Sequence, residues 1–455
     1  MNTLDDAWAY IASFYLGMPP WAVPLFWTAA VVVLSSTLSL AILIVQAQRT
    51  IRHIERRPEH GTGDRFQSNY LWVFVVPALN EEITIADAVE RLREVQVDHR
   101  HIIVVNDGSD DRTGEILKGL SGSDLTVLTR VTPQARQGKS EALNAAWRHL
   151  RSETLMREDL RGWDARRVIV TIVDADGRID PRAGRVAGHF ENRLVGGVQS
   201  LVRIYNRRSP LTWAQNLEFA VFGFVYQMGR MSWGTANMGG NGQFNRLQAL
   251  NEVAVQGSTG LAGPWREGRL TEDQDIGLRI IEAGWRGRQS TLVTIEQQGL
   301  NSLGALYRQR TRWAQGSWQM LDLAGRLVRN PSVSFIGRWD QFWYLMTPLL
   351  QAFMGATVLI TVILLASGIV SVVWSLPIFL LVYGFSVVPG VVGAVFARRS
   401  ANPLRIIAHI VAAHGYVLYS WLIFPVVYRA LWRQLCGRTS WTKTKREALE
   451  PPTAV

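Results

Sequence analysis

Two aspartates separated by a single alanine, Asp174 and Asp176, are the residues of this sequence best suited to chemistry. Two carboxylates on one turn repel each other unless a cation lies between them. Mg²⁺ and Mn²⁺ prefer oxygen ligands and are often held by one or two carboxylates together with substrate phosphates. The pair therefore predicts a Mg²⁺ or Mn²⁺ site. Taken alone, the motif is equally typical of a turn in which an aspartate caps the backbone that follows.

Polar residues also follow two other apolar runs. The run Leu71–Pro77 is continuous, as in a strand buried on both faces, and Asn80 and Glu81 come shortly after it. Residues 102–105 form a second run, which is followed by Asp107. An aspartate at this position can accept hydrogen bonds from a base or a ribose. As isolated motifs, both are also ordinary loops between a strand and a helix.

Lys139 lies between Gly138 and Ser140, just before a predicted helix. The motif resembles a P-loop only superficially, because the upstream glycine of that loop is missing. A lysine near a helix N-terminus can nevertheless contact a phosphate. The alternative interpretation is a solvated lysine that precedes a helix cap.

Thr271, Glu272 and Asp273 also precede a predicted helix. A cap formed by the threonine, with the two acids in the first turn, explains the motif on local grounds. In the functional interpretation, one carboxylate is a general base that removes the proton of an acceptor hydroxyl. The spacing of the three residues does not decide between these two interpretations.

Arg310, Arg312 and Trp313 lie in a segment that is rich in aromatic residues. The planar guanidinium group binds phosphates through paired hydrogen bonds, and the face of a tryptophan suits a sugar ring. An amphipathic helix whose arginines meet lipid headgroups is the structural interpretation. The two interpretations are compatible.

Apolar runs alternate with helical patterns from residue 69 onwards, which predicts a doubly wound α/β domain. Ligands of such sheets bind at the carboxyl ends of the strands, where the polar motifs fall. The predicted strands are Leu71–Pro77, Ile102–Val105, Thr126–Val131 and Val168–Val173. The predicted helices are Ile83–Val95, Asp111–Leu120 and Ser140–Leu150.

The N-terminal region contains an uncharged apolar stretch, Ala22–Ala47, that is long enough to cross a membrane. The arginines that follow it are Arg49, Arg52, Arg56 and Arg57. The positive-inside rule therefore places the end of this stretch in the cytoplasm. We expect a retained anchor and not a cleaved signal peptide. The aromatic residues within 1–20 suit either an interfacial helix or an unstructured lead-in.

Three further apolar stretches, at about 340–366, 369–397 and 404–428, are candidate membrane spans. Pro377, Pro389 and Gly390 make the middle stretch a candidate for a broken helix. Three crossings after a cytoplasmic domain would leave the C-terminal tail outside, yet its basic residues favour the inside. We therefore expect one stretch to be re-entrant or interfacial, or to contain a hairpin.

The composition agrees with a membrane protein. The chain has 455 residues, of which 48% are hydrophobic and 19% are charged, and its net charge is +11. Much of this charge flanks the apolar stretches, so we expect no nucleic acid as a partner. The single cysteine, Cys436, excludes an intramolecular disulfide and a zinc site of several cysteines.

An ordered series of motifs runs through the chain: VPALNE, NDGS, GKSEALN, DADG, GNGQF, TED and QRTRW. As a series they resemble the membrane-integrated family 2 glycosyltransferases, the group that includes cellulose, chitin and hyaluronan synthases. The resemblance covers about residues 70–320 and extends loosely through the C-terminal spans. It implies an α/β GT-A (nucleotide-diphospho-sugar transferase) domain, inserted between an N-terminal transmembrane helix and a C-terminal transmembrane region.

The resemblance implies a role for each motif. Asp273 would be the general base, with Glu272 beside it, and Asp176 and Asp174 would bind the metal. Trp313 would face the acceptor sugar. The loop beneath the acceptor would consist of Gly240, Asn241 and Gly242. The nucleotide sugar would be bound by Pro77, Asn80, Glu81, Asp107, Lys139, Asp174, Arg310 and Arg312.

The segment Trp441–Arg446 looks like the gating element that covers the bound nucleotide in processive members, with Lys443 and Arg446 as nucleotide contacts. That role would place the tail in the cytoplasm. Arg310 is a departure, since many synthases have glutamine there, and we expect it to alter the diphosphate or acceptor site. We recognise no c-di-GMP-binding domain after the last apolar stretch.

The resemblance predicts an inverting enzyme that transfers a sugar from UDP-glucose or UDP-N-acetylglucosamine, or less favourably from a GDP-sugar. The acceptor would be a growing polysaccharide, and the β-linked glycan would cross the membrane. The alternatives are transfer of a single sugar to a lipid acceptor, and a non-catalytic subunit that binds nucleotide sugars. Besides the lipid bilayer, the expected partners are a second copy of the chain in a homo-oligomer or accessory export proteins.

The expected protein is a multi-pass protein of the plasma membrane with a cytoplasmic catalytic domain. Its predicted parts are an interfacial segment and transmembrane helix at 1–48, a basic linker at 49–68, the GT-A domain at 69–300, interfacial helices at 301–335, transmembrane helices at 336–432 and a basic tail at 433–455.

Overall fold

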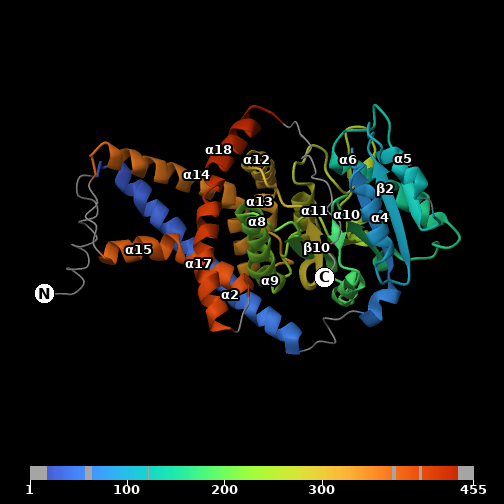
Figure 1. Cartoon of the computed structure of the whole chain (residues 1–455), viewed down its shortest axis with the longest axis horizontal. Helices are drawn as coiled ribbons and strands as arrows, with labels where there is room; N and C mark the ends of the chain where they lie inside the picture. The colour runs from blue at the N-terminus through green and yellow to red at the C-terminus, as the bar shows by residue number, and fades with distance from the viewer. Residues whose placement is uncertain (1–17, 57–63, 121, 371–375, 399–401, 439–455) are drawn as a thin grey trace.

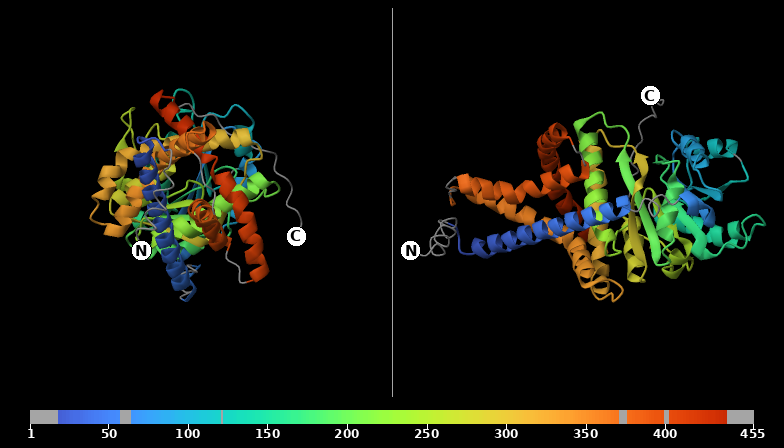
Figure 2. Two further views of the ribbon diagram at one scale, coloured as in Figure 1. Left: turned by 90° about the vertical axis from the view of Figure 1, so that its left-hand side faces the viewer. Right: turned by 90° about the horizontal axis from the view of Figure 1, so that it is seen from below.

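The computed structural model describes residues 18–56, 64–120, 122–370, 376–398 and 402–438. Figure 1 shows an α/β part, formed by the middle of the chain, beside a group of long helices. Helices α2 (Ala22–Arg56) and α14 (Phe335–Ala366) extend away from the sheet, towards the left of that view. The right-hand view of Figure 2 shows the same separation between the sheet and the far ends of these helices.

The α/β part is built on a mixed sheet with the strand order β3-β2-β1-β4-β7-β6-β10-β5. Strands β1 to β4 run parallel, β7 is antiparallel to both neighbours, and β5 pairs antiparallel with β10. The predicted α/β class is confirmed. The strands are β1 Leu71–Ala78, β2 Arg100–Asn106, β3 Leu125–Thr129, β4 Val168–Ile172, β5 Arg178–Ile179, β6 Val195–Ile204, β7 Gln243–Arg246 and β10 Arg286–Gln297, with a separate pair β8 Val255–Gln256 and β9 Ala262–Gly263.

The sheet is buried on both faces, which explains why β1 is apolar throughout. Trp72 and Phe74 point into the core on one face, beside helix α4. Val73 and Val75 alternate with them and pack on the other face, beside α6. Each fully buried side chain of this size contributes about 1.5–3 kcal/mol, so the two faces together hold the strand in the centre of the sheet.

The three predicted helices are present, with ends shifted by a few residues. The helix expected at Asp111–Leu120 begins at Thr113, because the carboxylate of Asp111 accepts a hydrogen bond from the backbone nitrogen of Thr113 at 2.9 Å and forms a turn. The helices of this part are α4 Ile85–Arg93, α5 Thr113–Gly119, α6 Lys139–Ser152, α7 Ala187–Phe190, α8 Pro210–Val221, α9 Met228–Met231, α10 Leu247–Glu252 and α11 Glu272–Glu282. Shorter 3₁₀ turns are η1 Asp64–Asn69, η2 Thr154–Met156, η3 Ala165–Arg167 and η4 Ala183–Val186, and η5 Phe222–Gln227 is a π-helical turn.

Three apolar helical stretches in the described part of the chain are long enough to cross a membrane: Ala22–Glu55, Phe335–Ala366 and Pro403–Leu435. The last combines α17 (Pro403–Ser420) with α18 (Ile423–Leu435), so the span predicted at 404–428 is interrupted near Trp421. Three helical elements connect the last strand of the sheet to α14 along the chain. They are α12 (Leu303–Gln319), η6 (Met320–Leu323) and α13 (Ala324–Val328).

The stretch predicted to contain a broken helix does contain one. It forms α15 (Leu376–Ser386) and α16 (Val388–Arg398), with Pro389 in the first turn of α16. Each helix has 11 residues, whereas a single span needs about 20. Within the described residues, neither helix is therefore long enough to cross a membrane by itself.

Candidate active site

The turn that carries Asp174 and Asp176 follows directly after β4. Its backbone is held by Asn241, whose Oδ1 accepts from the nitrogen of Asp174 at 3.1 Å and whose Nδ2 donates to Oε1 of Gln297 at 3.1 Å. A Cβ atom on Gly177 would lie 2.7 Å from Oδ1 of Asn241, so this position requires glycine. Asn241, predicted as an acceptor contact, thus supports the aspartate turn and is itself buried. Its acceptor role stays a prediction.

The two aspartates suit a divalent cation by the chemistry of their donor atoms. Asp176 is buried, and its Oδ2 accepts from the backbone nitrogen of Gln298 at 3.4 Å. No group of three His, Cys, Asp or Glu residues in the described chain could hold a metal by protein ligands alone. Two carboxylates fit Mg²⁺ or Mn²⁺ when a diphosphate supplies further oxygens. We therefore retain Asp174 and Asp176 as the expected ligands.

Lys139 joins the aspartate turn to the Thr-Glu-Asp motif. It is the first residue of α6, and its Nζ lies 2.7 Å from Oδ1 of Asp174 and 3.2 Å from Oε1 of Glu272. Burial opposes a charge on Lys139, but the two carboxylates outweigh this effect and raise its pKa. A positive charge therefore lies between two acidic motifs that are far apart in the sequence.

The cap interpretation of Thr271, Glu272 and Asp273 is correct in position and wrong in its hydrogen bond. Thr271 occupies the N-cap position of α11 and both acids lie in the first turn, but the threonine side chain makes no cap hydrogen bond. Its hydroxyl instead donates to Oε1 of Gln274 at 3.4 Å. The functional interpretation of the two acids stays a prediction.

Asp273 has the electrostatic environment of a proton acceptor. Loss of solvation, followed by the nearby charge of Glu272, raises its pKa to about 7, although Lys139 and Arg312 oppose the shift. Its Oδ1 accepts a hydrogen bond from the backbone nitrogen of Gln274 at 2.8 Å. A carboxylate with a pKa near the working pH is suited to general base catalysis.

Two glycines of the GNG loop are required by close approaches. Gly240 has a φ of +85°, and a Cβ atom there would lie 2.7 Å from Oδ2 of Asp273. Gly242 has a φ of +71°, and a Cβ atom there would collide with Ser200 and Ile295. Both conformations favour glycine. The backbone at Gly240 therefore borders Asp273 directly, whereas Gly242 lies against the sheet.

The loops after β1 and β2 are tied together. Asn80 has a φ of +55°, its Nδ2 donates to Oδ1 of Asp110 at 2.6 Å, and its Oδ1 accepts from the nitrogen of Asp110 at 2.9 Å. The backbone nitrogen of Glu81 donates to the hydroxyl of Thr113 at 2.7 Å. Pro77 lies in β1 just before this loop. The two loops thus form one rigid edge, and their nucleotide-binding role stays a prediction.

Asp107 has basic neighbours that the sequence interpretation missed. Its Oδ1 lies 2.6 Å from Nη1 of Arg130, and Arg136 donates twice to the carbonyl of Gly108 at 2.9 Å and 2.8 Å. Loss of solvation raises the pKa of Asp107, while Arg130 acts in the opposite direction. A signal was present in the sequence, because Arg130 and Arg136 flank the end of the predicted strand Thr126–Val131.

Arg310 and Trp313 lie where α12 meets α8 and α17. Nη2 of Arg310 lies 2.5 Å from Oε2 of Glu218, which also accepts from the hydroxyl of Tyr419 at 2.7 Å. The guanidinium of Arg310 lies 4.0 Å from the ring centroid of Trp313, and Phe219 meets the same ring edge-on. These contacts favour a structural role for Arg310, and its binding of a diphosphate stays a prediction.

Comparison with known protein families shows to which family this chain belongs. The family model described as "Glycosyltransferase like family 2" matches residues 72–316, which is more than half of the chain. The chain belongs to this family. The predicted resemblance is thereby confirmed at the level of the family and its fold.

Two curated relatives are similar in sequence to part of this chain. The Beta-monoglucosyldiacylglycerol synthase of Synechocystis sp. (strain ATCC 27184 / PCC 6803 / Kazusa) is 28% identical over 312 residues, covering 67% of this chain and 60% of that protein. The Poly-beta-1,6-N-acetyl-D-glucosamine synthase of Staphylococcus aureus (strain COL) is 25% identical over 257 residues, covering 54% of this chain and 55% of that protein. The chain thus spans only about 60% or less of the length of these relatives.

A solved structure shares the fold. The mannosyltransferase PcManGT from Pyrobaculum calidifontis, in complex with GDP-Man and Mn²⁺, aligns with a TM-score of 0.51 at 17% identity and covers 88% of this chain and 99% of that chain. At this identity the likeness concerns the fold alone. This family 2 chain thus has a GT-A-like mixed-sheet domain with apolar helices before and after it.

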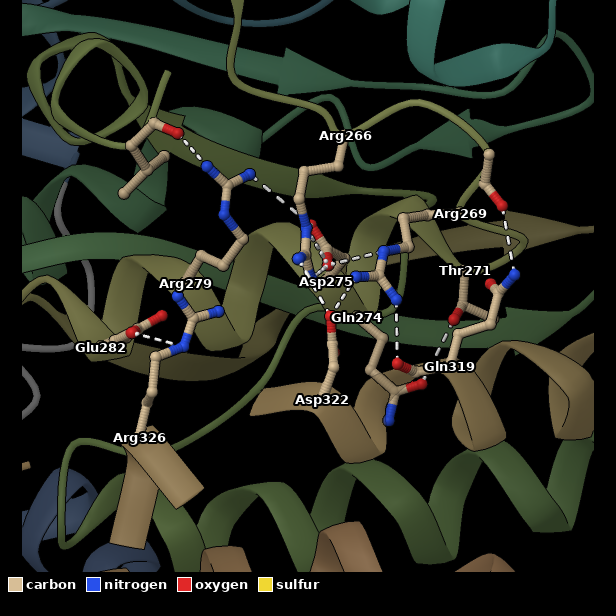
Figure 3. Close-up of polar contacts among 12 residues, drawn as sticks. Arg266, Arg269, Thr271, Gln274, Asp275, Arg279, Glu282, Gln319, Asp322 and Arg326 are labelled. Carbon is tan, nitrogen blue, oxygen red and sulfur yellow. Dashed lines mark hydrogen bonds and ion pairs between the residues drawn. The ribbon is translucent and has the colours of Figure 1, made fainter. Parts of the chain in front are cut away.

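A buried charge cluster, missed by the sequence interpretation, holds the loop before α11. Figure 3 shows three arginines converging on Asp275, which is fully buried. The distances to its carboxylate are 2.8 Å from Nε of Arg266, 3.4 Å from Nε of Arg269 and 3.5 Å from Nη1 of Arg279. Arg266 and Arg269 also contact Asp322 of η6. The cluster therefore fixes the first turn of α11, where Asp273 lies.

Arg312 supports the same loop from α12. Its Nη1 donates to the carbonyl of Leu270 at 3.0 Å, and a Cβ atom on Gly316 would collide with Thr271. Arg312 is therefore close to the predicted base, where it also counters the rise in the pKa of Asp273. Its contact with a diphosphate stays a prediction. Lys443, Arg446 and the rest of the expected gating element lie outside the described residues.

Proposed function

We propose that this family 2 chain is a membrane-bound glycosyltransferase that moves a sugar from a nucleotide diphosphate sugar to an acceptor hydroxyl. The observation that carries the proposal is the position of Lys139, within 2.7 Å of Asp174 and 3.2 Å of Glu272. It links Asp174, one of the expected metal ligands, to Glu272, the residue beside the expected base Asp273. Three motifs that are remote in sequence thus meet at one edge of the sheet, where substrates of such sheets bind.

The proposed reaction is a direct displacement with inversion. Asp273 takes the proton of the acceptor hydroxyl, and the acceptor oxygen forms a bond to the anomeric carbon of an α-linked sugar. The bond from that carbon to the diphosphate breaks, and its electron pair leaves with the diphosphate. Lys139, Arg312 and a Mg²⁺ or Mn²⁺ ion held by Asp174 and Asp176 would neutralise the charge that develops there. The product carries a β-linkage.

The first acceptor that we propose is a membrane lipid, which receives a single sugar. Three of the curated relatives carry the name Beta-monoglucosyldiacylglycerol synthase. The second is the growing polysaccharide that the sequence resemblance favours. It is supported by the relative named Poly-beta-1,6-N-acetyl-D-glucosamine synthase, which shares 25% identity over a shorter segment. The proposed donor is UDP-glucose or UDP-N-acetylglucosamine in either case.

The experiment is a donor and acceptor screen with the full-length protein in lipid nanodiscs. Radiolabelled UDP-glucose, UDP-N-acetylglucosamine and GDP-mannose are supplied with Mg²⁺, Mn²⁺ or EDTA, with and without diacylglycerol. We expect one UDP-sugar to give a labelled lipid only with the metal and diacylglycerol. Long polymer without diacylglycerol would select the second acceptor. No transfer from any donor, or equal transfer by the Asp273→Asn variant, contradicts the proposal.

The proposed topology has three crossings, made by α2, α14 and the broken α15–α16 pair, with α17 and α18 as interfacial helices. The contacts with α8 support it, because Arg398 at the end of α16 lies 5.2 Å from the ring centroid of Trp213 and the hydroxyl of Tyr419 at the end of α17 donates to Glu218 at 2.7 Å. The catalytic domain and the C-terminal end of α18 then lie on the same, cytoplasmic, side, as the basic tail requires. Cys436, which is exposed at the end of α18, allows a direct test. A membrane-impermeant maleimide should label it only after the cells are permeabilised. Labelling of intact cells that is lost in Cys436→Ser would contradict this topology.

A further inference from the structure

Helix α14, one of the candidate membrane spans, contacts Gln274, the residue that follows the predicted base Asp273. The hydroxyl of Tyr344, on α14, accepts hydrogen bonds from Nε2 of Gln274 at 3.0 Å and from Nδ2 of Asn237 at 3.4 Å. The backbone nitrogen of Gln274 is the group that donates to Oδ1 of Asp273 at 2.8 Å. Gln274 therefore holds the carboxylate of Asp273 through its backbone and α14 through its side chain.

Tyr344 is itself held by a buried ion pair. The guanidinium of Arg230, on α9, lies 4.4 Å from the centroid of the Tyr344 ring. Arg230 also binds Asp340 of α14, with Nε at 2.7 Å and Nη2 at 3.4 Å from its two carboxylate oxygens. The exposed fractions of the Arg230 and Asp340 side chains are 7% and 5%. A paired and desolvated contact of this kind has a strong geometric preference, so it limits the positions available to Tyr344.

The two halves of α14 have different surroundings. Its first half contributes Asp340 and Leu345 to contacts with the catalytic domain. Pro348 lies inside the helix and has no N–H to donate to the carbonyl of Tyr344, so the regular helical bonding is interrupted one turn after this residue. Beyond it, apolar side chains such as Leu359 and Val362 are exposed, as they would be against lipid. The first half of α14 thus belongs structurally to the catalytic domain.

We infer that Tyr344 is a positioning residue for Asp273, through which the first C-terminal membrane helix sets the geometry of the base. This inference rests on the proposed function of Asp273. Leu345 shares an apolar cluster with Leu278 and Ile281 of α11, and this cluster would hold the two helices together without the hydroxyl. The hydroxyl therefore acts on the orientation of the first turn of α11 and not on the stability of the interface as a whole.

The Tyr344→Phe variant isolates this effect, because it removes the hydroxyl and keeps the ring. With the full-length protein in nanodiscs, we expect kcat to fall about fivefold, the size expected for one hydrogen bond, while KM for the nucleotide sugar stays within about twofold. The Gln274→Met variant should lose a similar factor, and the double variant no more than either single one. The matched control is Tyr70→Phe, which removes another tyrosine hydroxyl, bonded to Glu191 at 2.9 Å on the far side of the domain.

Hydrogen exchange of the peptide that covers residues 270–277 tests the link without any activity. We expect its amides to exchange about fivefold faster in Tyr344→Phe than in the wild type or in Tyr70→Phe. Unchanged exchange overturns the inference. Faster exchange with an unchanged kcat also overturns it, since the link would then have no effect on the base. Absence of transfer in the wild type contradicts the proposed function instead, and the exchange result still decides the link.

Discussion

Lys139 and Asp174 form an ion pair, with 2.7 Å between Nζ and Oδ1, that places one positive charge at the centre of the acidic site. Lys139 also counters the rise in the pKa of Asp273. We expect Lys139→Gln to raise the pKa of Asp273 further, so that the acid limb of the pH–rate profile moves to higher pH. The rate at pH 6 should fall more than the rate at pH 8. A profile with an unmoved acid limb contradicts the role assigned to Lys139, and Lys118→Gln, an exposed lysine of α5, is the control.

The wild-type pH dependence follows from the pKa of Asp273, which burial raises to about 7. A general base acts in its deprotonated form, and a raised pKa means that this form is the minority below pH 7. We expect kcat/KM to rise about tenfold per pH unit below pH 7 and to level off above it. A rate that does not change between pH 5.5 and 7.5 would argue against Asp273 as the base.

The close approach of Gly240 to Asp273 predicts a local defect. A Cβ atom at Gly240 would lie 2.7 Å from Oδ2 of Asp273, so Gly240→Ala should displace the carboxylate. We expect kcat to fall by about 100-fold, since small displacements of reacting groups are costly, with nucleotide binding retained. Gly260→Ala is matched, because Gly260 has a similar φ of +77° but no atom within 4 Å of the added Cβ. If the two substitutions lowered kcat equally, the loss would be due to backbone strain and not to displacement of the Asp273 carboxylate.

The cluster around Asp275 predicts a large loss of stability. Asp275→Asn leaves three arginines without their shared carboxylate in a buried site, and breaking such a pair typically costs about 3–5 kcal/mol. The thermal midpoint of the detergent-solubilised protein should fall by several degrees. Glu282→Gln removes a more exposed ion pair, with 3.1 Å to Arg326, and should change the unfolding free energy by less than about 1 kcal/mol. Similar midpoints for the two variants would contradict the assigned importance of the cluster.

The strands nearest the site were predictable because each is buried on both faces. Residues 71–77 and 102–105 are continuous apolar runs, residues 168–173 are interrupted only by Thr171, and all three correspond to strands of the sheet. The break in the stretch 369–397 was also predictable, since proline cannot continue a helix without losing a hydrogen bond. The start of the helix after Asp111 was not, because a side-chain bond to the backbone replaced the first turn.

The charge partners within the candidate site were not predictable in the same way. Asp275 lies two residues after Asp273, yet its partners Arg266 and Arg269 come from the preceding loop, and both arginines also bind Asp322 of η6. The contact between Arg310 and Glu218 joins positions that are 92 residues apart. Ion pairs of this kind have no periodic pattern in the chain, so the sequence showed the charges without their partners.

The sequence by itself determined the family, the α/β class and the residue types of the site, because apolar periodicity and short motifs record interactions between neighbours in the chain. Tertiary structure decided which of these residues meet. It brought Lys139 between Asp174 and Glu272, left Thr271 without the cap bond that its position predicts, and joined Gln274 to Tyr344 of the apolar helix α14. These contacts depend on where separate segments cross, which is set by the packing of the whole sheet and its helices.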